Sequence, residues 1–282
     1  MRHIASVSFG KDSLAMLLLL LEKEMPLDEV IFYNSEMEFQ AIYDIRDRMK
    51  PVLEQRGIRF TELKPDAPFL YDMLEKPITS KKNGFHLGYG WCGGPCRWAT
   101  KLKIKALDGL GADAEVHYVG IAADEPDRLE RLKPPKCSPL AEAGITEADC
   151  LAYCYRRGFF WEENGIRLYD ILDRVSCWCC KNKNRRELKN IYQFLPQYWK
   201  RLKELQAREE KEIDRVLRIL SGECAAQREN ILYDYDLLVQ LDTIFARAQL
   251  SYAMDAGRPL VRKRGGIDLK LSLIHISEPT RP

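Results

Sequence analysis

IASVSFGKDSLAMLLLLLEKE, residues 4–24, joins a short apolar run to a turn of small and polar residues and then to an unbroken helix-forming segment. The pattern predicts a buried strand over 4–9, a loop over 8–13 and a helix over 14–24. Two further strands with β-branched and aromatic residues are expected at 29–34 and 58–63, on either side of a helix at 42–56. Strands that alternate with helices predict a parallel sheet.

The loop at 8–13 stands where a strand hands over to a helix. Free N–H groups and the positive end of the helix dipole make this position attractive to anions. Small residues would let a phosphate approach the backbone, serine hydroxyls can donate to its oxygens, and Lys11 supplies charge. The Walker spacing GxxxxGK[ST] is absent, and an ordinary glycine turn before a helix is the alternative interpretation.

The remaining chain suggests more sheet and then a helical part. After an irregular stretch at 64–100, a helix is expected at 101–110, a fourth strand at 116–122 and a sheet edge at 134–139. A capping box, Thr146-Glu147-Ala148-Asp149, predicts a helix that ends at Gly158. Further helices are expected at 186–195 and 197–220. Residues 225–270 are ambiguous, although Gly257, Pro259, Gly265 and Gly266 suggest a loop-rich end.

We therefore expect an α/β fold, a parallel twisted sheet with flanking helices, followed by a mostly helical C-terminal part. The predicted organisation is a nucleotide-binding α/β domain at 1–145, a helical, cysteine-containing subdomain at 146–220 and an uncertain region at 221–270. LSLIHISEPTRP, residues 271–282, closely resembles the translation of an adapter used in sequencing libraries. We interpret it as an artefact, which leaves open whether the native C-terminus is present; a natural polar tail is the alternative.

The overall composition excludes several classes of protein. Hydrophobic residues make up 46% and charged residues 30% of the 282 residues, typical of a soluble globular chain and not of a disordered one or a membrane bundle. The net charge of +2 gives no global argument for a nucleic-acid partner. Locally, residues 181–203 carry eight Lys or Arg and one Glu among aromatic residues. Such a stretch fits either single-stranded nucleic acid or, as we favour, a solvated helix face.

Cysteine is the other unusual feature, with nine residues against four histidines. No secretory signal precedes the first strand, so we expect a cytoplasmic protein with reduced thiols. Cys92-x3-Cys96 and Cys177-x-Cys179-Cys180 form two close-spaced groups whose thiolates could hold an iron–sulfur cluster, with zinc as the alternative. A tryptophan-rich cysteine core without metal is the other interpretation.

Several motifs resemble one known family. SFGKDS at 8–13 resembles the pyrophosphate loop (PP-loop) of the adenine nucleotide alpha-hydrolase superfamily, in which SGGxDS marks ATP pyrophosphatases and related forms mark phosphoadenosine phosphosulfate (PAPS) reductases. YNSEMEF at 33–39 resembles the family segment DTG-x-EFP, and GIAADEPDR at 120–128 is similar to G-[IL]-R-x-x-E-[S]-x-x-R. The motifs extend from residue 4 to about residue 195.

The resemblance implies a set of functional residues. Lys11 and Asp12 would be catalytic, and Asp12 favours ATP because an acidic residue in a phosphate loop is explained by a bridging Mg²⁺. The residues expected to bind the adenine nucleotide or sulfonucleotide are Ser8, Phe9, Gly10, Lys11, Asp12, Ser13, Asn34, Glu38, Gly120 and Arg128.

The resemblance also bears on the cysteines. Trp91-Cys92 and Leu102-Lys103 resemble the WC-x(n)-LK motif of the iron–sulfur branch, which implies Cys92, Cys96, Cys177 and Cys180 as ligands, with Cys179 as a substitute. A PAPS reductase also uses a nucleophilic cysteine in ECG-[IL]-H. Here Glu223-Cys224 is followed by Ala-Ala-Gln, so Gly and His are missing and Cys224 is a weak candidate for that catalytic role.

The functional expectation is an enzyme of the PAPS reductase family with two alternative reactions. One is thiol-dependent reduction of a sulfonucleotide to sulfite, and the other is adenylation by ATP, with release of pyrophosphate, coupled to sulfur transfer. The partners implied are a thioredoxin-like reductant or a sulfur donor, and a nucleic-acid acceptor, with no membrane. The alternative is a nucleic-acid-binding or defence-associated module whose loop only senses nucleotide.

Overall fold

A computed structural model describes residues 2–81, 84–88, 96, 102–254, 260–261 and 267–268. Within the chain, contacts define two compact units, Met1–Asp214 and Arg215–Pro282. Both the predicted anion loop and the segment 146–214 belong to the first unit. Cys92 and residues 271–282 lie outside the described residues, so the predictions made for them remain predictions.

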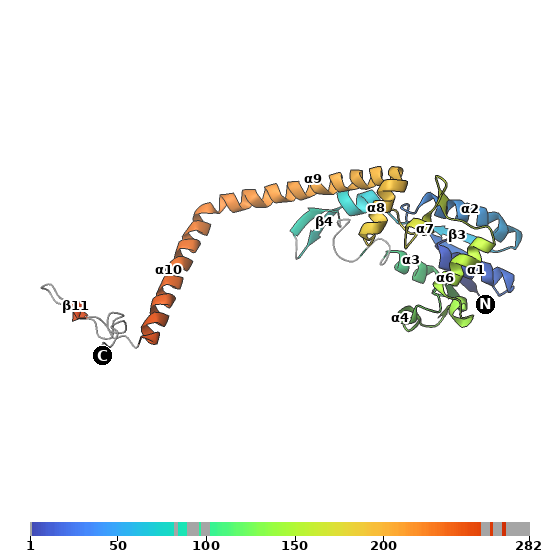
Figure 1. Cartoon of the computed structure of the whole chain (residues 1–282), viewed down its shortest axis with the longest axis horizontal. Helices are drawn as coiled ribbons and strands as arrows, with labels where there is room; N and C mark the ends of the chain where they lie inside the picture. Colours follow the sequence, from blue (N-terminus) through green and yellow to red (C-terminus); the bar gives the residue numbers. More distant parts are fainter. Residues whose placement is uncertain are drawn as a thin grey trace, which may run out of the picture. The chain divides into compact units, whose positions relative to one another are not determined.

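The first unit is built on a five-stranded parallel sheet, which confirms the predicted fold class (Figure 1). The strand order is β3-β2-β1-β6-β7. The chain steps outward from β1 through β2 to β3 and then returns to the other side of β1 with β6. Loops at the carboxyl ends of β1 and β6 therefore face each other at a topological switch point, where ligands bind in such sheets. The strands are β1 (His3–Ser6), β2 (Glu29–Tyr33), β3 (Arg59–Leu63), β6 (Val116–Val119) and β7 (Lys136–Cys137).

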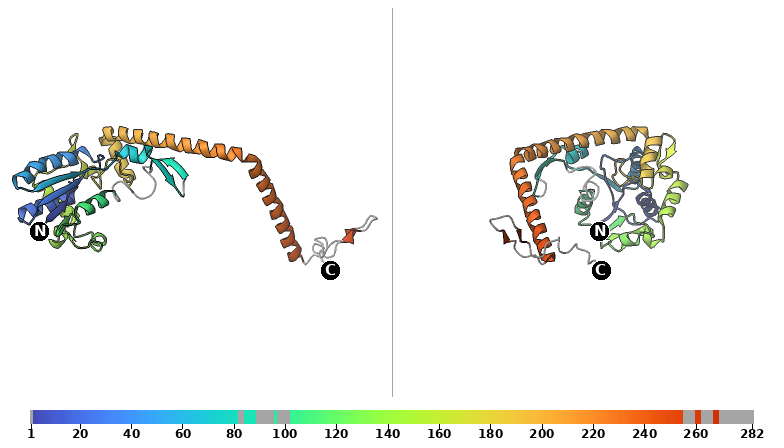
Figure 2. Two further views of the ribbon diagram at one scale, coloured as in Figure 1. Left: turned by 180° about the vertical axis from the view of Figure 1, so that it is seen from behind. Right: turned by 60° about the vertical axis from the view of Figure 1, so that its left-hand side comes forward.

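Alternation along the strands gives the sheet two apolar faces. Ala5, Val30 and Phe32 belong to the large core, which also contains the buried residues of α1, α2 and α6. Their neighbours Ile4 and Ile31 point to the opposite face and pack against α3. Figure 2 shows the sheet and its flanking helices from two further directions. The helices next to the sheet are α1 (Lys11–Glu22), α2 (Gln40–Gln55), α3 (Lys103–Leu110), α5 (Pro139–Glu142) and α6 (Glu147–Arg156).

The capping box predicted at Thr146 is present. The Thr146 side chain accepts from the Asp149 N–H, and the Asp149 carboxylate accepts from the Thr146 N–H. Helix α6 ends before Gly158, which has φ +73°. The remaining elements of this unit are α4 (Pro126–Leu129), β8 (Glu162–Glu163), β9 (Ile166–Arg167), α7 (Leu168–Ile171) and α8 (Arg185–Phe194), with α9 (Pro196–Ala226) beginning after it.

Two stretches differ from the sequence-based expectation. Within 64–100, predicted irregular, the described residues form the π-helical turn η1 (Tyr71–Glu75) and an antiparallel hairpin of β4 (Pro77–Ser80) and β5 (Gly84–Leu87). Within 225–270, where the sequence pattern is ambiguous and suggests a loop-rich end, α10 (Arg228–Ala253) is a helix; the Gly and Pro residues that suggest loops begin only at Gly257. A short pair, β10 (Leu260–Val261) and β11 (Ile267–Asp268), follows.

Of the two long helices, α9 carries many charged residues, whereas α10 is richer in apolar and aromatic residues. No helix within the described ranges combines the length and apolar character needed to cross a lipid bilayer.

Candidate active site

The loop between β1 and α1 is held by its own side chains. Ser13 Oγ accepts a hydrogen bond from the Ser8 N–H at 3.1 Å, lies 3.0 Å from Ser8 Oγ and donates to the Gly10 carbonyl at 3.2 Å. Gly10 caps α1 in an extended conformation, so the chain enters the helix directly from the turn. The predicted order of strand, loop and helix is therefore present, with α1 beginning at Lys11.

Phe9 anchors this loop in the core. Its backbone has φ +58°, a left-handed conformation that costs energy for any residue but glycine. Burial and a hydrogen bond offset this strain. The Phe9 ring is buried and packs edge-on against the Phe32 ring, with 5.3 Å between the ring centroids, and the Phe9 carbonyl accepts from Trp161 Nε1 at 2.7 Å. Phe9 thus belongs to the core and is not among the described residues that line the cavities next to the loop.

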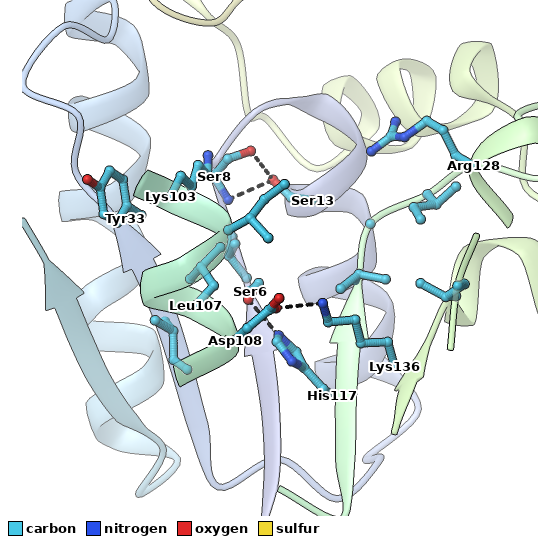
Figure 3. Close-up of a pocket in the computed structure, with 17 residues that line it drawn as sticks. Ser6, Ser8, Ser13, Tyr33, Lys103, Leu107, Asp108, His117, Arg128 and Lys136 are labelled. Carbon is cyan, nitrogen blue, oxygen red and sulfur yellow. Dashed lines mark hydrogen bonds and ion pairs between the residues drawn. The ribbon is translucent and has the colours of Figure 1, made fainter. Parts of the chain in front are cut away.

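Two cavities meet at this loop. A polar cavity of about 530 Å³ lies over the loop and the start of α1, and a less polar cavity of about 360 Å³ lies between the sheet and α3. Figure 3 shows the second cavity, with Arg128 on one side and Tyr33 and Lys103 on the other. Both cavities are lined by Ser8, Ser13, Gly120 and Arg128, so they form one elongated site.

Opposite charges are interleaved in the polar cavity. Lys11 Nζ lies 2.8 Å from Asp12 Oδ1 and 3.4 Å from Glu147 Oε1. Arg128 Nη1 lies 2.5 Å from Glu125 Oε1. Burial raises the pKa of Asp12, and Glu147 and Glu125 raise it further, against the lowering effect of Lys11. The cavity could therefore bind a polyphosphate best together with a cation that compensates its carboxylates.

The second cavity has a buried imidazole at its base. His117 of β6 and Ser6 of β1 face the α3 side, with 2.7 Å between His117 Nε2 and Ser6 Oγ (Figure 3). Beside them Lys136 Nζ and Asp108 Oδ1 form an ion pair at 2.6 Å. Burial, aided by Lys136, lowers the pKa of His117 to about 4. A neutral imidazole paired with a hydroxyl thus forms the base of this cavity.

His117 is expected to stay neutral throughout the physiological range. Because its pKa falls from 6.5 to about 4 on folding, its neutral state stabilises the fold above pH 6.5, and this stability is lost as pH falls towards 4. NMR of the imidazole carbons, assigned with His117→Gln, should show no titration between pH 8 and about 5. A midpoint near the ordinary histidine value would contradict this environment.

Gly120 lets the end of β6 approach the loop. A methyl group at this position would lie 2.7 Å from Ser13 Cα and 2.8 Å from the Ser13 nitrogen, closer than real contacts allow. Gly120→Ala is therefore expected to lower the free energy of unfolding by roughly 1–3 kcal/mol and to displace the loop. Gly109→Ala, on α3 with open space around it, is the matched control and should cause no loss. Urea unfolding of both variants checks this, and equal losses would contradict the steric account.

Asn34 and Glu38 lie apart from both cavities, at the carboxyl end of β2. The Asn34 amide donates to Glu62 Oε1 at 2.7 Å, and its Oδ1 accepts from the Glu36 N–H and from the Tyr43 hydroxyl. Neither residue is among the described residues that line the cavities. Glu38 instead faces a cysteine, with Cys177 Sγ donating to its Oε1 at 3.7 Å.

The cysteines expected to bind a metal are only partly brought together. Cys177 and Cys180 share one turn, in which the Cys180 N–H donates to the Cys177 carbonyl at 3.1 Å, and Cys179 between them is buried. Cys96 is half-buried against the main core. Within the described residues, no three His, Cys, Asp or Glu side chains are grouped as a metal site, and Cys92 is not among them. Burial and Glu38 raise the pKa of Cys177, which does not favour a free thiolate.

The other cysteines have different surroundings. Cys150 and Cys154 on α6 are fully buried, and desolvation raises the pKa of Cys154 to about 12. They are core thiols, as their spacing on one helix face suggests. Cys224 is exposed on α9, beyond the boundary of the first unit. No hydrogen bond to its thiol occurs in the described part of the chain.

Sequence reasoning missed several residues of the site. Tyr169 and Arg174 line the polar cavity, and Ser6, Asp108 and His117 line the other. The sequence indicates Glu147 only as part of a capping box, not as a residue of the polar cavity. The signal that could have found Ser6 and His117 is the strand register. They occupy positions of β1 and β6 that face the same side of the sheet, but this can be recognised only once the strand pairing is known.

The fold and the loop define an α/β protein with a candidate anion site at the switch point of a parallel sheet. Residues 2–86 match the model of the family described as "Phosphoadenosine phosphosulfate reductase domain". The predicted resemblance to the PAPS reductase family is confirmed over that range.

Two other comparisons cover different shares of the chain. A stretch of 69 residues, 24% of this chain, is 42% identical to 9% of "Endonuclease MutS2" from Lachnospira eligens. The same-named protein of Latilactobacillus sakei subsp. sakei is 44% identical over 70 residues, again 9% of its length. The chain thus spans about a tenth of the length of the curated relatives it matches.

Among solved structures, the chain is similar to the "U34-tRNA thiolase NcsA from Methanococcus maripaludis with its [4Fe-4S] cluster". The sequence identity is 18% and the TM-score 0.40, with 72% of this chain and 73% of that chain covered. At that similarity the activity of one chain does not follow from that of the other.

Proposed function

We propose that this chain is an ATP-using enzyme that adenylates an acceptor and releases pyrophosphate ahead of sulfur transfer. The observation that carries the proposal is the placement of Asp12 at the start of α1, beside Lys11 and Glu147, in the polar half of an elongated site. An adenosine fits the 360 Å³ cavity between the sheet and α3, and the phosphates would extend over the loop.

The charges favour ATP over a sulfonucleotide. Four carboxylates line the polar cavity and outnumber its three cations, so the cavity would repel a bare phosphate or sulfate; the carboxylates are those of Asp12, Glu125, Glu147 and Asp173. ATP brings Mg²⁺, which prefers carboxylate and phosphate oxygens and would compensate this repulsion. Asp12 is the residue best suited to hold it, because it stands in the loop itself.

In the proposed reaction an acceptor oxygen attacks the α-phosphorus of ATP. A new P–O bond forms to the acceptor, the bond between the α-phosphorus and the bridging oxygen breaks, and pyrophosphate leaves with that electron pair. The chain would contribute Lys11 and the helix N-terminus as charge for the phosphates. A sulfur nucleophile from a donor would then displace AMP from the activated acceptor, for which a nucleic acid is a candidate.

Sulfonucleotide reduction is less well supported. It needs an activated cysteine, and Cys224 is exposed on a helix without the Gly and His that follow the nucleophile in the family motif. A thioredoxin-like reductant would be its partner. Its product, sulfite, distinguishes this reaction from adenylation.

An iron–sulfur cluster, or zinc, is proposed at Cys177 and Cys180 together with Cys96 and Cys92. The described residues alone do not complete a ligand set, so no step of the proposed adenylation depends on the metal. Anaerobic purification followed by a visible spectrum and metal analysis tests it. Cys177→Ala should lose the metal, whereas Cys224→Ala, with its exposed thiol, should keep it.

The test of the proposed function is a product assay on the full chain. Incubation with Mg²⁺-ATP and candidate acceptors should release pyrophosphate, and incubation with PAPS and a thiol reductant should release no sulfite. Sulfite that disappears in Cys224→Ser would contradict the proposal in favour of the reductase reaction.

A second candidate is a nucleic-acid-binding module, favoured by the likeness of a quarter of the chain to part of Endonuclease MutS2. The basic stretch 181–203 gives it limited support, because several of its cations are engaged within the fold. Lys183 is buried, Arg186 pairs with Asp173, and the Arg201 guanidinium lies 4.1 Å from the centre of the Trp178 ring. Strong, salt-sensitive binding of nucleic acid without any pyrophosphate release would favour this candidate.

A further inference from the structure

The polar cavity has a second wall, which comes from the segment 169–175 far along the chain. Tyr169, Asp173, Arg174 and Val175 line it opposite the loop. This segment lies close over Gly10, because a methyl group there would be 3.5 Å from the Tyr169 hydroxyl and 3.7 Å from the Val175 carbonyl oxygen. Any phosphate bound by the loop is therefore within reach of the opposite wall.

Arg174 is the cation of this cavity that remains uncommitted. Lys11 and Arg128 are each paired with carboxylates. In the part of the chain that the structure describes, the Arg174 guanidinium makes no ion pair or hydrogen bond. Its backbone is held firmly, since its N–H donates to Glu187 Oε1 at 3.4 Å and its carbonyl accepts from Lys183 Nζ at 3.3 Å.

The neighbouring Asp173 does not neutralise Arg174. Its carboxylate pairs with Arg186 and accepts from the Asn184 amide at 2.7 Å. The positive charge of Arg174 is thus available to an anion in the cavity, and a guanidinium is well suited to phosphate oxygens because it can donate two parallel hydrogen bonds.

Tyr169 connects this wall to the loop. Its hydroxyl accepts a hydrogen bond from the Lys11 N–H at 2.9 Å. Its ring packs edge-on against the Trp161 ring, with 5.0 Å between the ring centroids. A hydroxyl that accepts one hydrogen bond can still donate its own proton. Burial raises the pKa of Tyr169, so the hydroxyl stays protonated and able to donate. Among the described residues we find no acceptor for that proton.

We propose that Arg174 and Tyr169 bind the terminal phosphates of the nucleotide, the part that leaves as pyrophosphate. Ser8, Ser13, Gly120 and Arg128, common to both cavities, would then contact the middle of the ligand, while Lys11, Tyr169 and Arg174 line only the polar end. The inference rests on the proposed function for the identity of the ligand as a nucleoside triphosphate, and it adds two residues that the family motifs do not include.

Equilibrium titration of the full chain with Mg²⁺-ATP, Mg²⁺-pyrophosphate and AMP tests the inference. Arg174→Gln is expected to weaken binding of ATP and pyrophosphate by about tenfold or more and to leave AMP binding unchanged. Tyr169→Phe should weaken the same two ligands severalfold. Arg185→Gln is the matched control, an exposed arginine that does not line the cavity, and should bind all three ligands like the parent chain.

Equal binding of pyrophosphate by Arg174→Gln and the parent chain would overturn the inference, and so would an equal loss of AMP. Unfolding curves of each variant separate loss of a contact from loss of the fold. A parent chain that binds pyrophosphate but releases none from ATP would contradict the proposed function alone, and the Arg174→Gln result would still decide the inference. A parent chain that binds neither ATP nor pyrophosphate would overturn both.

Discussion

Asp12→Asn is expected to reduce pyrophosphate release from Mg²⁺-ATP by roughly a hundredfold or more, because the variant loses the loop carboxylate that would hold Mg²⁺ against the phosphates. Asn keeps the shape of the side chain and removes only its charge. Since burial raises the pKa of Asp12, its charge costs stability in the fold. The variant should therefore unfold at the same or a higher temperature while its activity falls.

Asp44→Asn is the matched control for this change. Asp44 is exposed on α2, where it accepts from the Gln40 side chain, and it does not line either cavity. Loss of the Asp44 charge should leave pyrophosphate release unchanged. If Asp12 only complements the dipole of α1, the two variants will be equally active, and the proposed role of Asp12 is wrong.

Glu29→Gln is expected to lower the free energy of unfolding by about 3 kcal/mol. The Glu29 carboxylate, 2% exposed at the start of β2, binds Arg2 Nη2 and Arg59 Nη2 at 2.6 Å each and also accepts from the Thr61 hydroxyl. It joins three elements at the amino end of the sheet. Removing the charge would leave two arginines without their buried partner.

The same pairing predicts a pH dependence. These partners outweigh the opposing effect of burial and lower the pKa of Glu29 to about 2. Its ionised form stabilises the fold fully above pH 4.5, and this stability is lost as pH falls from 4.5 towards 2. Urea unfolding between pH 7 and 3 should show this loss in the parent chain and much less of it in Glu29→Gln.

Glu54→Gln, on the exposed face of α2, is the control and should change neither the stability nor its pH dependence. An equal slope in acid for the parent chain and Glu29→Gln would show that other carboxylates dominate the acid response.

The local features of the fold could be predicted from the sequence, since they depend on neighbours in the chain. The loop between Ser8 and Ser13 follows from the order of strand, small residues and helix, and the capping box at Thr146 follows from a spacing of three residues. The hairpin of β4 and β5 was missed because it lies outside the main sheet and forms around short, mixed sequences.

Of the candidate site, only the side formed by the loop could be predicted from the sequence. Lys11 and Asp12 stand in a recognisable motif, whereas Tyr169 reaches Lys11 across 158 positions of sequence. Nothing in the local sequence around Tyr169 or Arg174 indicates a ligand, because the role proposed for them depends on how α7 and the turn after it pack over the loop. Asn34 illustrates the opposite case, since it stands in a segment that resembles a family motif but its amide is hydrogen-bonded to Glu62, Glu36 and Tyr43.

The most direct test of a nucleotide bound at this loop is amide hydrogen exchange of the full chain with and without a saturating non-hydrolysable Mg²⁺-ATP analogue. The account predicts slower exchange in the peptides that contain Ser8–Ser13 and Gly120, with little change in α10. Unchanged exchange at Ser8–Ser13 in the presence of bound analogue would contradict it.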